Sequence, residues 1–501
     1  SGFYLAMHDL EIRGAGNLLG AEQHGHMEAV GYDLYCKLLS QAVKTAKGEK
    51  EKEDFETVVD LTLDAYVPDT YITDEFQKLD VYKRIAGIED ERDFNDMSDE
   101  LMDRFGPLPK PVRNLLLIAD LKACAHWLAK HCQAFGLQAR VYPTARHPIV
   151  VARTPGARQR RAGRPHFVVY GHYDVQPPEP FELWQSPPFE PRLKGGALYG
   201  RGASDNKGQH LAHLKAVEAY LETGTELPCD ITFVIEGEEE VGSTSLEGFL
   251  KQHRSELACD AVIVSDTGMP TPKHPALTYA LRGIAAYEVI VHGPARDLHS
   301  GIFGGSVDNP AMVLCQILAQ LRDKNGRITI PGFYDDVQPL SAYERRQFKR
   351  LPFNEREYRK FLGVPRLFGE RGHTPLEQRS ARPTLEINGL TSGYQGEGSK
   401  TIVPAWARAK ITTRLVPNQK PARIIKLVRD HLARLCPPTV RLEIKTGHGA
   451  EAYWVSPTGP DARAALRALK TAFGCEPVLV REGGSIPIVN QFKRVLRADT
   501  L

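Results

Sequence analysis

The stretch FVVYGHYD at residues 167–174 decides the fold, because an apolar run typical of a buried strand ends directly in a histidine and an aspartate. The same arrangement recurs in ITFVIEGEEEVGS at residues 231–243 and in AVIVSD at residues 261–266, and a further polar cluster, SDNKG, occupies residues 204–208. Neighbouring buried strands of an open α/β sheet bring their C-terminal ends to one edge, where sites form. We therefore expect an α/β fold whose polar clusters meet at that edge.

Length and composition narrow the class of protein. The 501 residues exceed what one hydrophobic core usually supports, so two or more domains are expected. The net charge is +2, from 64 basic and 62 acidic residues, and it does not indicate nucleic acid or an anionic membrane as a partner. No apolar stretch approaches the ~20 residues of a membrane span, and no secretory pattern opens the chain. The eight cysteines contain no C-x-x-C pair, which favours reduced thiols in a cytoplasmic protein.

The first ~125 residues have a different pattern from the rest. The sequence opens inside an apolar segment, as if in mid-domain, and it predicts an amphipathic helix over residues 32–46, a strand over 58–63 and a helix over 74–88. Two further helices should flank FGPLP at residues 105–109, where glycine and proline mark a break. This part is expected to be a separate, mainly helical α+β fragment.

Four strings in this part, DLEIRGAGNLLG (9–20), DAYVPD (64–69), KLDVYKRIA (78–86) and DRFGPLP (103–109), occur in the order found in the bacterial transcription-repair coupling factor family. The resemblance covers residues 1–122 and implies a motif that couples ATP hydrolysis to movement on duplex DNA. The chain contains no G-x-x-x-x-G-K-[ST] phosphate loop, so autonomous translocation is not expected. Arg13, His24 and His26 are interpreted as structural residues.

From Trp127 onwards, through RVYPTARHPIVVA at residues 140–152, the sequence resembles the dinuclear zinc dipeptidase and aminoacylase family, in its carnosinase-like branch. The switch falls inside one predicted helix without a Gly/Ser linker, which indicates a fusion of two truncated segments or an unusual natural one. The resemblance implies a phosphorylase/hydrolase-like zinc-peptidase α/β/α domain with an inserted α+β lid and dimerisation domain. The expected divisions are residues 1–125, 126–280, 281–448 and 449–501.

The polar clusters supply the donor types that two adjacent cations need, since a carboxylate can bridge them while imidazole and carboxylates fill the outer positions. By resemblance, His172, Asp205 and Asp266 would hold one metal, and Asp205 and Glu240 would contribute to the other. Asp174 could turn back to hydrogen-bond the imidazole of His172 and fix its tautomer. The family holds two Zn²⁺ ions, with Mn²⁺ as an alternative.

Glu239 precedes the expected ligand Glu240, and in the family the first glutamate of such a pair is the general base. The alternative is that residues 238–240 form a solvated acidic run, but three adjacent carboxylates after a buried strand repel one another unless a cation compensates them. Residues 200–208 should turn from strand to helix, with the family's cis peptide at Asp205–Asn206. His210 and His213 are interpreted as residues on the surface of that helix.

The expected lid carries strings that extend the resemblance, DLHSG (297–301), TTRLVP (412–417), GHGAEAYWV (447–455) and REGGSIP (481–487). They imply that His299 reaches the site of a partner subunit and stabilises the oxyanion there, so a homodimer is expected. They also imply that Arg414 pairs with the terminal carboxylate of a dipeptide or acyl-amino acid substrate, as its bidentate fork allows, with His448 and Ser485 nearby.

One family feature is missing, because no histidine follows His448 in this sequence, where the family has its last metal ligand. We therefore expect about one tightly held metal and a possible loss of activity. Two alternatives stay open at this point. The first is a DNA-repair-associated binding module in residues 1–122 with an inert peptidase portion, and the second is two fragments that cannot complete their cores.

Overall fold

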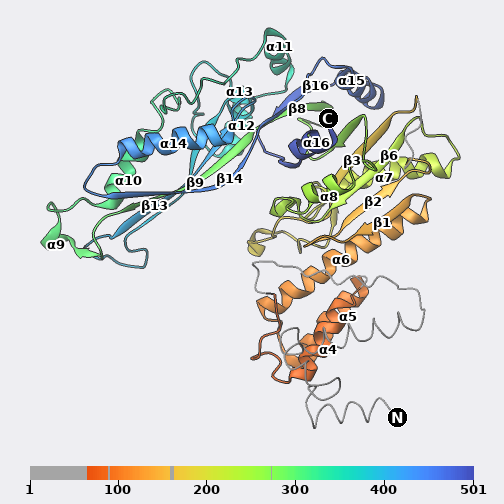
Figure 1. Cartoon of the computed structure of the whole chain (residues 1–501), viewed down its shortest axis with the longest axis horizontal. Coiled ribbons are helices and arrows are strands. Elements are labelled where there is room, and N and C mark those ends of the chain that lie inside the picture. The colour runs from red at the N-terminus through yellow and green to blue at the C-terminus, as the bar shows by residue number, and fades with distance from the viewer. Residues whose placement is uncertain (1–64, 89–90, 158–162, 272) are drawn as a thin grey trace, which may run out of the picture. The chain divides into compact units, whose positions relative to one another are not determined.

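The structure is a computed structural model that describes residues 65–88, 91–157, 163–271 and 273–501 (Figure 1). The chain divides into two compact units, residues 1–57 and 58–501, of which the second contains all the described residues. The predicted helix over 32–46, the predicted strand over 58–63, Arg13, His24 and His26 lie outside the described residues.

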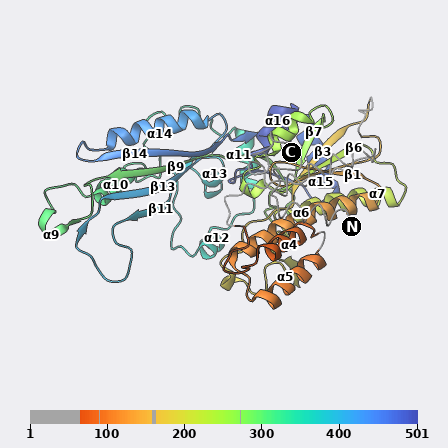
Figure 2. The ribbon, with the colours of Figure 1, turned by 60° about the horizontal axis from the view of Figure 1, so that its bottom comes forward.

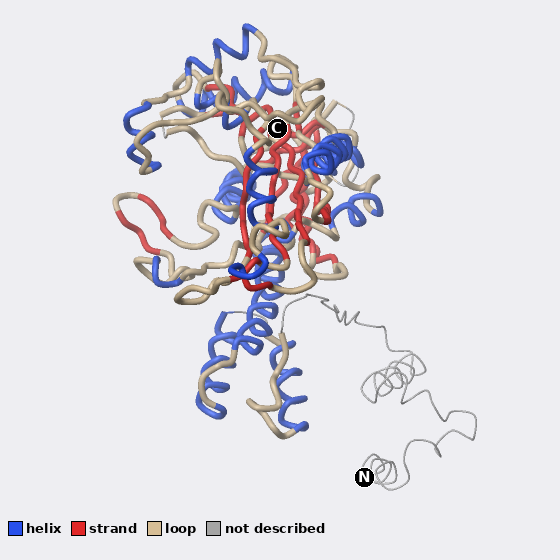
Figure 3. The backbone as a smooth tube through the Cα atoms, turned by 90° about the vertical axis from the view of Figure 1, so that its left-hand side faces the viewer, coloured by secondary structure: helices blue, strands red, loops and turns tan. Residues whose placement is uncertain are grey.

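The segment from residue 65 to residue 134 is built from three helices and has no strand among its described residues (Figure 3). Helix α4 (Glu75–Ala86) begins after Asp74, whose side chain accepts a hydrogen bond from the Gln77 amide, and α5 (Glu91–Phe105) and α6 (Lys110–Ala134) follow. The predicted helix over 74–88 and the predicted pair around FGPLP are confirmed. Gly106 permits the break between α5 and α6 because its φ of 86° lies in the left-handed region.

Helix α6 runs without interruption across the point where the two sequence resemblances meet. Its first half packs Val112 and Leu116 into the core of the helical segment, and its second half packs Leu128 and Cys132 against the neighbouring sheet. The expectation of one helix at this junction is confirmed. One element therefore completes two hydrophobic cores.

The sheet that α6 covers has six strands in the order β1-β2-β6-β3-β7-β17. Strand β3 (His166–His172) lies parallel to its neighbours β6 (Asp230–Glu236) and β7 (Ala261–Val264). Strand β7 also pairs in parallel with β17 (Asp499–Thr500). At the other side of the sheet, β2 (Ile149–Arg153) pairs antiparallel with both β6 and β1 (Gln138–Tyr142). Helices α6 and α7 (Lys207–Glu222) pack on one face, and α8 (Leu246–Gln252) and α16 (Ile488–Leu496) on the other. Because β3, β6 and β7 are parallel neighbours, their C-terminal ends meet at one edge, as predicted.

A second, three-stranded sheet shares the core of α8 and α16, in the order β15-β8-β16. Its strands are β8 (Ala276–Leu281), β15 (Tyr453–Trp454) and β16 (Val478–Glu482), with α15 (Pro460–Phe473) packed beside β8. The chain between β7 and β8 thus leaves the main sheet. After β14 it contributes β15 and β16 to the second sheet and rejoins the main sheet at β17. Between β3 and α7 the chain forms the short turn η2 (Phe181–Leu183) and the hairpin of β4 (Arg192–Lys194) and β5 (Ala197–Tyr199).

The inserted region forms a four-stranded antiparallel sheet in the order β11-β13-β9-β14 with its own hydrophobic core. The strands are β9 (Gly283–His292), β11 (Thr384–Ser392), β13 (Trp406–Leu415) and β14 (Arg441–Ala450), and the packed helices are α10 (Pro310–Ala319) and α14 (Pro421–Leu435), the latter alongside β14 (Figure 2). Smaller elements are β10 (Leu298–His299), α9 (Ser300–Phe303), α11 (Ala342–Arg350), α12 (Glu355–Leu362), α13 (Pro375–Ser380) and β12 (Ile402–Val403). The charged stretch after Ser341 is two helices, because Pro352 interrupts it and Asn354 caps the second.

Candidate metal centre

Three predicted metal ligands converge at the C-terminal edge of the main sheet. His172 ends β3, Asp266 follows β7, and Asp205 lies in the turn that precedes α7. The Nε2 atom of His172 lies 3.2 Å from an oxygen of Asp205 and 3.7 Å from an oxygen of Asp266. One ligand atom from each residue fits within a 4.8 Å group, the sole such group of three or more histidine, cysteine and acidic side chains in the part of the chain that the structure describes.

Asp174 connects this group to the turn after β6. The Nδ1 atom of His172 lies 3.3 Å from an Asp174 carboxylate oxygen and 3.0 Å from the Asp174 carbonyl oxygen. The same carboxylate accepts hydrogen bonds from the amides of Glu239, at 3.3 Å, and Glu240, at 2.9 Å. Asp174 therefore fixes both the imidazole and the glutamate pair, which extends the contact expected from the sequence.

The electrostatics of His172 fit a cation at its Nε2 atom. The side chain is fully buried, and Nε2 has no hydrogen-bond partner among the described residues. Burial alone would lower its pKa, but the interactions with Asp174 and Asp266 outweigh burial and raise the pKa of His172 to about 11. In the absence of a metal a proton would balance the carboxylates, and a divalent cation would take its place because imidazole and carboxylate oxygens are ordinary ligands for such ions.

Glu239 and Glu240 lie in a single 3₁₀ turn, η3 (Glu239–Val241), directly after β6. Burial raises the pKa of Glu239 to about 7, although nearby His172 opposes the shift, and burial also raises the pKa of Glu240. The Oε2 atom of Glu240 accepts a hydrogen bond from Gln176, whereas Oε1 is buried without a partner among the described residues. Glu240 thus stands outside the three-residue group with one oxygen available.

The surroundings of Glu238 contradict the alternative that residues 238–240 form a solvated acidic run. Its side chain is buried, and its Oε1 accepts from the His147 amide at 3.1 Å while Oε2 accepts from the Ser245 amide at 3.0 Å. The hydroxyls of Thr144 and Thr244 also donate to this carboxylate. The alternative is therefore wrong for Glu238, because four donors from two loops replace water around it and hold the glutamate turn in place.

Sequence reasoning did not assign a role to Asn206, which follows Asp205 across a cis peptide bond at the expected position. Its side chain is buried, accepts from the His172 amide at 3.2 Å and donates to an Asp266 oxygen at 3.2 Å. Asn206 thus orients two of the three grouped residues. The sequence signal that could have identified Asn206 was its amide side chain directly after the expected ligand Asp205.

The interpretation of His210 and His213 as surface residues is wrong. His210 is buried, and a Cβ at Gly171 would lie 2.7 Å from the His210 Cβ, so only glycine fits at that point of β3. Burial lowers the pKa of His210 to about 4. His213 is half-buried and lies 2.7 Å from the Ser265 hydroxyl. Both side chains face the sheet because α7 packs against β3 on this side.

Two of the predicted substrate-binding residues, Arg414 and Ser485, contact each other. Arg414 donates a 2.8 Å hydrogen bond to the Ser485 hydroxyl, and Ser485 in turn donates to the Arg282 carbonyl at 2.5 Å. Burial lowers the pKa of Arg414. His299 is exposed and its Nδ1 accepts from the Gly301 amide at 3.1 Å, while the side chain of His448 lies outside the described part of the structure.

The described cysteines are free thiols, and no described helix is both long and apolar enough to cross a bilayer.

Comparison with known proteins gives two family matches. The model for "Peptidase family M20/M25/M40" matches residues 168–499, and the model for the "TRCF domain" matches residues 61–134. The Cys-Gly metallodipeptidase DUG1 of Saccharomyces cerevisiae is 36% identical over 344 residues, which cover 67% of this chain and 71% of that protein. The Beta-Ala-His dipeptidase of Homo sapiens is 33% identical over 337 residues, which cover 66% of each.

Solved structures agree with the sequence matches. The di-peptidase Dug1p from Saccharomyces cerevisiae has a TM-score of 0.65 at 28% identity, covering 84% of this chain and 90% of that one. Human carnosine dipeptidase 1 has a TM-score of 0.66 at 28% identity, covering 84% of this chain and 91% of that one. Both resemblances drawn from the sequence are confirmed, as is the mixed α/β fold with a separate lid sheet and an N-terminal helical segment.

Proposed function

The chain belongs to peptidase family M20/M25/M40 and is a metallopeptidase of the dipeptidase type, and we propose that it cleaves dipeptides at the edge formed by His172, Asp205 and Asp266. The observation that carries this proposal is the convergence of the Asp205 and Asp266 carboxylates on the buried Nε2 of His172, which makes no hydrogen bond within the described residues. Carboxylates gathered in this way repel one another unless a positive charge compensates them, either the protonated imidazole or a metal ion. The site is therefore suited to hold a divalent metal.

His172, Asp205 and Asp266 would hold one ion, and Asp205 with Glu240 would contribute to a second. Zn²⁺ is our first choice, with Mn²⁺ as the alternative, because both accept imidazole and carboxylate ligands. A bound cation would polarise the scissile carbonyl and lower the pKa of a coordinated water. The unpartnered Oε1 of Glu240 supports its assignment as a ligand.

Glu239 is proposed as the general base. Its pKa of about 7 lets the carboxylate accept a proton from water at neutral pH and return it to the leaving amine. Asp174 would support this step, since its hydrogen bond to the Glu239 amide holds the base beside the ligand group. Protonated Glu239 is the acid that the second half of the reaction needs.

Arg414 is proposed to bind the terminal carboxylate of the substrate, with Ser485 orienting the guanidinium and His448 nearby. The exposed His299 does not contribute to the site of its own chain in our proposal; it would donate to the oxyanion in the partner subunit of a homodimer. The names of the relatives, Cys-Gly metallodipeptidase and Beta-Ala-His dipeptidase, support dipeptides with a free C-terminal carboxylate, and acyl-amino acids share that group.

The test is hydrolysis of a dipeptide panel that includes Cys-Gly and β-Ala-His by the full 501-residue chain, with added Zn²⁺ or Mn²⁺. We expect turnover that falls about 10²–10⁴-fold in a Glu239→Gln variant with unchanged metal content. Turnover that is no greater than in that variant would remove the proposed activity.

Metal analysis of the same samples gives a second readout. We expect about one tightly held ion per chain, because a single group of three ligands converges among the described residues. Two tight ions per chain would show that a further group completes the second position.

The alternative of a DNA-binding module is not favoured by the charges of the helical segment. Helix α5 (Glu91–Phe105) carries six carboxylates and two arginines, and such a surface repels phosphates. Salt-dependent duplex binding by the full chain that is lost on substitution of residues in this segment would contradict this conclusion.

A further inference from the structure

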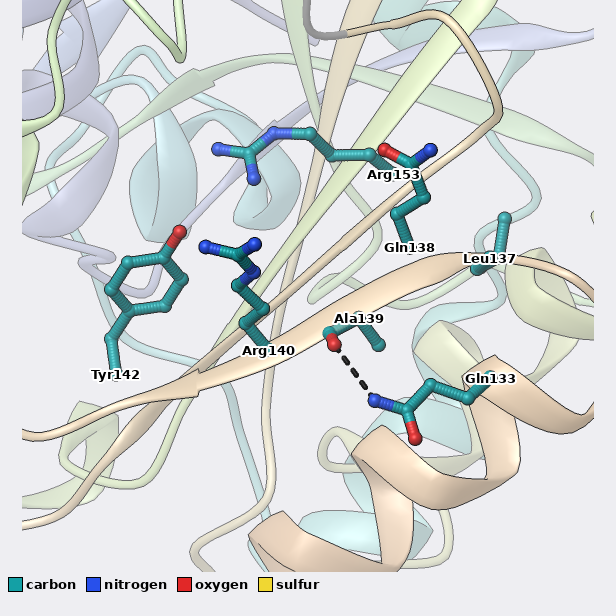
Figure 4. A pocket seen from close by; sticks show the side chains of 7 residues that line it. All are labelled: Gln133, Leu137, Gln138, Ala139, Arg140, Tyr142 and Arg153. Carbon is teal, nitrogen blue, oxygen red and sulfur yellow. Dashed lines mark hydrogen bonds between the residues drawn. The ribbon is translucent and has the colours of Figure 1, made fainter. Parts of the chain in front are cut away.

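A hollow of ≈ 360 Å³ lies along the edge strand β1, where Arg140 and Tyr142 of β1 and Arg153 of β2 line it (Figure 4). In the sheet, Arg153 pairs with Thr232 near the start of β6, whereas the metal-binding residues follow the ends of β3, β6 and β7. The Arg153 end of the hollow is therefore at the opposite end of the central strands from His172. It does not belong to the candidate metal centre.

Arg153 is the buried cation of this hollow, and it has few acceptors. The residue is 5% exposed, its Nη2 donates to Glu256 at 3.4 Å, and its Nε is buried without a partner among the described residues. A guanidinium carries five N–H donors, and the one long hydrogen bond to Glu256 leaves the buried Nε–H unmatched. Burying a charge with so few acceptors is costly unless another group supplies them.

A second guanidinium faces the same space. Gln138, Arg140 and Tyr142 occupy alternate positions of β1 and so project from the same side of the strand. Figure 4 shows the guanidinium groups of Arg140 and Arg153 and the Tyr142 hydroxyl pointing toward one another across the hollow. No aspartate or glutamate is among the described residues that line it. Two described cations thus share a space in which Glu256 pairs with Arg153 but not with Arg140, so the pair of guanidinium groups keeps an excess positive charge.

We propose that this hollow binds a small oxyanion of the phosphate class. Guanidinium groups match phosphate oxygens through paired N–H donors, and the Tyr142 hydroxyl and the exposed Gln138 amide add neutral donors. Such an anion would offer further acceptors to Arg153 and would compensate the charge of Arg140. The site is independent of the proposed peptidase reaction and of its metal.

The probe is inorganic phosphate, titrated calorimetrically into the metal-loaded 501-residue chain at constant ionic strength. The test variant is Arg140→Gln, because Arg140 is exposed and its loss leaves the core unchanged. The matched control is Arg441→Gln, an exposed arginine of β14 whose nearest carboxylate, on Glu443, lies 4.0 Å away. We expect phosphate to bind about tenfold more weakly to Arg140→Gln and with unchanged affinity to Arg441→Gln.

Two further arms separate the sources of the signal. A His172→Ala variant should keep the phosphate affinity, since phosphate on a metal at the candidate centre would be lost with that ligand. Glycerol 3-phosphate replaces inorganic phosphate in the second arm, and tighter binding of the ester would identify a phosphorylated metabolite rather than free phosphate as the ligand. Equal phosphate affinity in the unmodified chain and in Arg140→Gln, or no binding to either, would overturn the proposal.

Discussion

The helical segment and the main sheet share helix α6 but bury very different groups. The helical core is made of aliphatic and aromatic side chains, and Lys78 is the one polar or charged residue of residues 65–134 that is buried in the described structure. The sheet buries His172, Asp174, Glu236 and Glu238 close to one edge. Buried polar groups lower stability unless they are satisfied, and clusters of perturbed pKa values mark functional sites. The difference teaches that the helical segment is organised for packing and the sheet edge for chemistry.

The largest expected effect removes the cation site from the sheet edge. His172→Ala deletes the one nitrogen ligand, and metal affinity should fall by more than about 10³-fold, because even residues that only support a ligand account for 10–100-fold. Equilibrium dialysis against Zn²⁺ measures the change. An exposed histidine of α6, in the variant His126→Ala, is the control and should bind as before. Equal metal affinity in both variants would show that the metal binds at another site.

The second-largest expected effect is the pH dependence of stability that the buried Glu236 gives to the sheet edge. Burial raises the pKa of Glu236 to about 8, although hydrogen bonds from Tyr170 and Ser243 oppose the shift. The pKa of Glu236 in the folded protein exceeds the ordinary value of 4.5, so protonated Glu236 favours the folded state. This contribution of Glu236 to the free energy of unfolding is complete below pH 4.5 and is lost as pH rises to 8. The loss should be on the order of 4 kcal/mol.

A Glu236→Gln variant should lack this loss, because the amide stays neutral. Urea unfolding at pH 5 and pH 8.5 measures it, with Glu190→Gln, at an exposed position, as the control. A pH dependence as steep in Glu236→Gln as in the unmodified chain would assign the titration to another group.

The third effect tests whether the two regions unfold together. Leu116→Ala removes a fully buried side chain from the α6 face in the helical core and should cost about 3 kcal/mol. Its neighbour Leu117 is 46% exposed, so Leu117→Ala should change little. Calorimetry should show one transition shifted to lower temperature, because α6 also completes the core of the sheet. Two separate transitions, with only one shifted, would contradict this coupling.

The smallest effect concerns the surface of the helical segment. Hydrogen bonds from Arg84 and Arg104 lower the pKa of Glu100 to about 2, so its stabilisation is present above pH 4.5 and is lost as pH falls through 2. The group is partly solvated, and Glu100→Gln should therefore cost less than about 1 kcal/mol at pH 7. Chemical denaturation measures the change in the free energy of unfolding. The control variant is Asp96→Asn, since Asp96 in the unmodified chain lies 3.9 Å from Arg92. A cost above that of Leu116→Ala would reverse the comparison.

Several features of the candidate site were readable from local sequence. The stretches 167–174, 231–243 and 261–266 predicted three strands with polar ends, and these strands are β3, β6 and β7. The helices over 74–88 and around FGPLP followed from periodicity and from the proline and glycine between them. Such signals are local, because side-chain alternation and backbone restrictions act over a few residues.

Other features escaped sequence reasoning because they depend on what packs against what. His210 and His213 have the spacing of an exposed helix face, yet contact between α7 and β3 at Gly171 buries the first and half-buries the second. Glu238 belongs to an acidic run, and only the loops around Thr144 and Thr244 supply the donors that bury it.

The sequence by itself determined the family, the α/β class, the helix that joins the two regions and the identity of the polar side chains at the strand ends. The tertiary structure alone decided which of those side chains meet: His172, Asp205 and Asp266 form one group, and Asp174 and Asn206 orient it. The physical reason is the distance along the sequence over which each kind of interaction acts. Strand and helix signals are written in neighbouring residues, whereas much of the burial and charge that set the pKa values of His172 and Glu239 comes from other strand ends, such as Asp266 after β7, that only the folded sheet brings together.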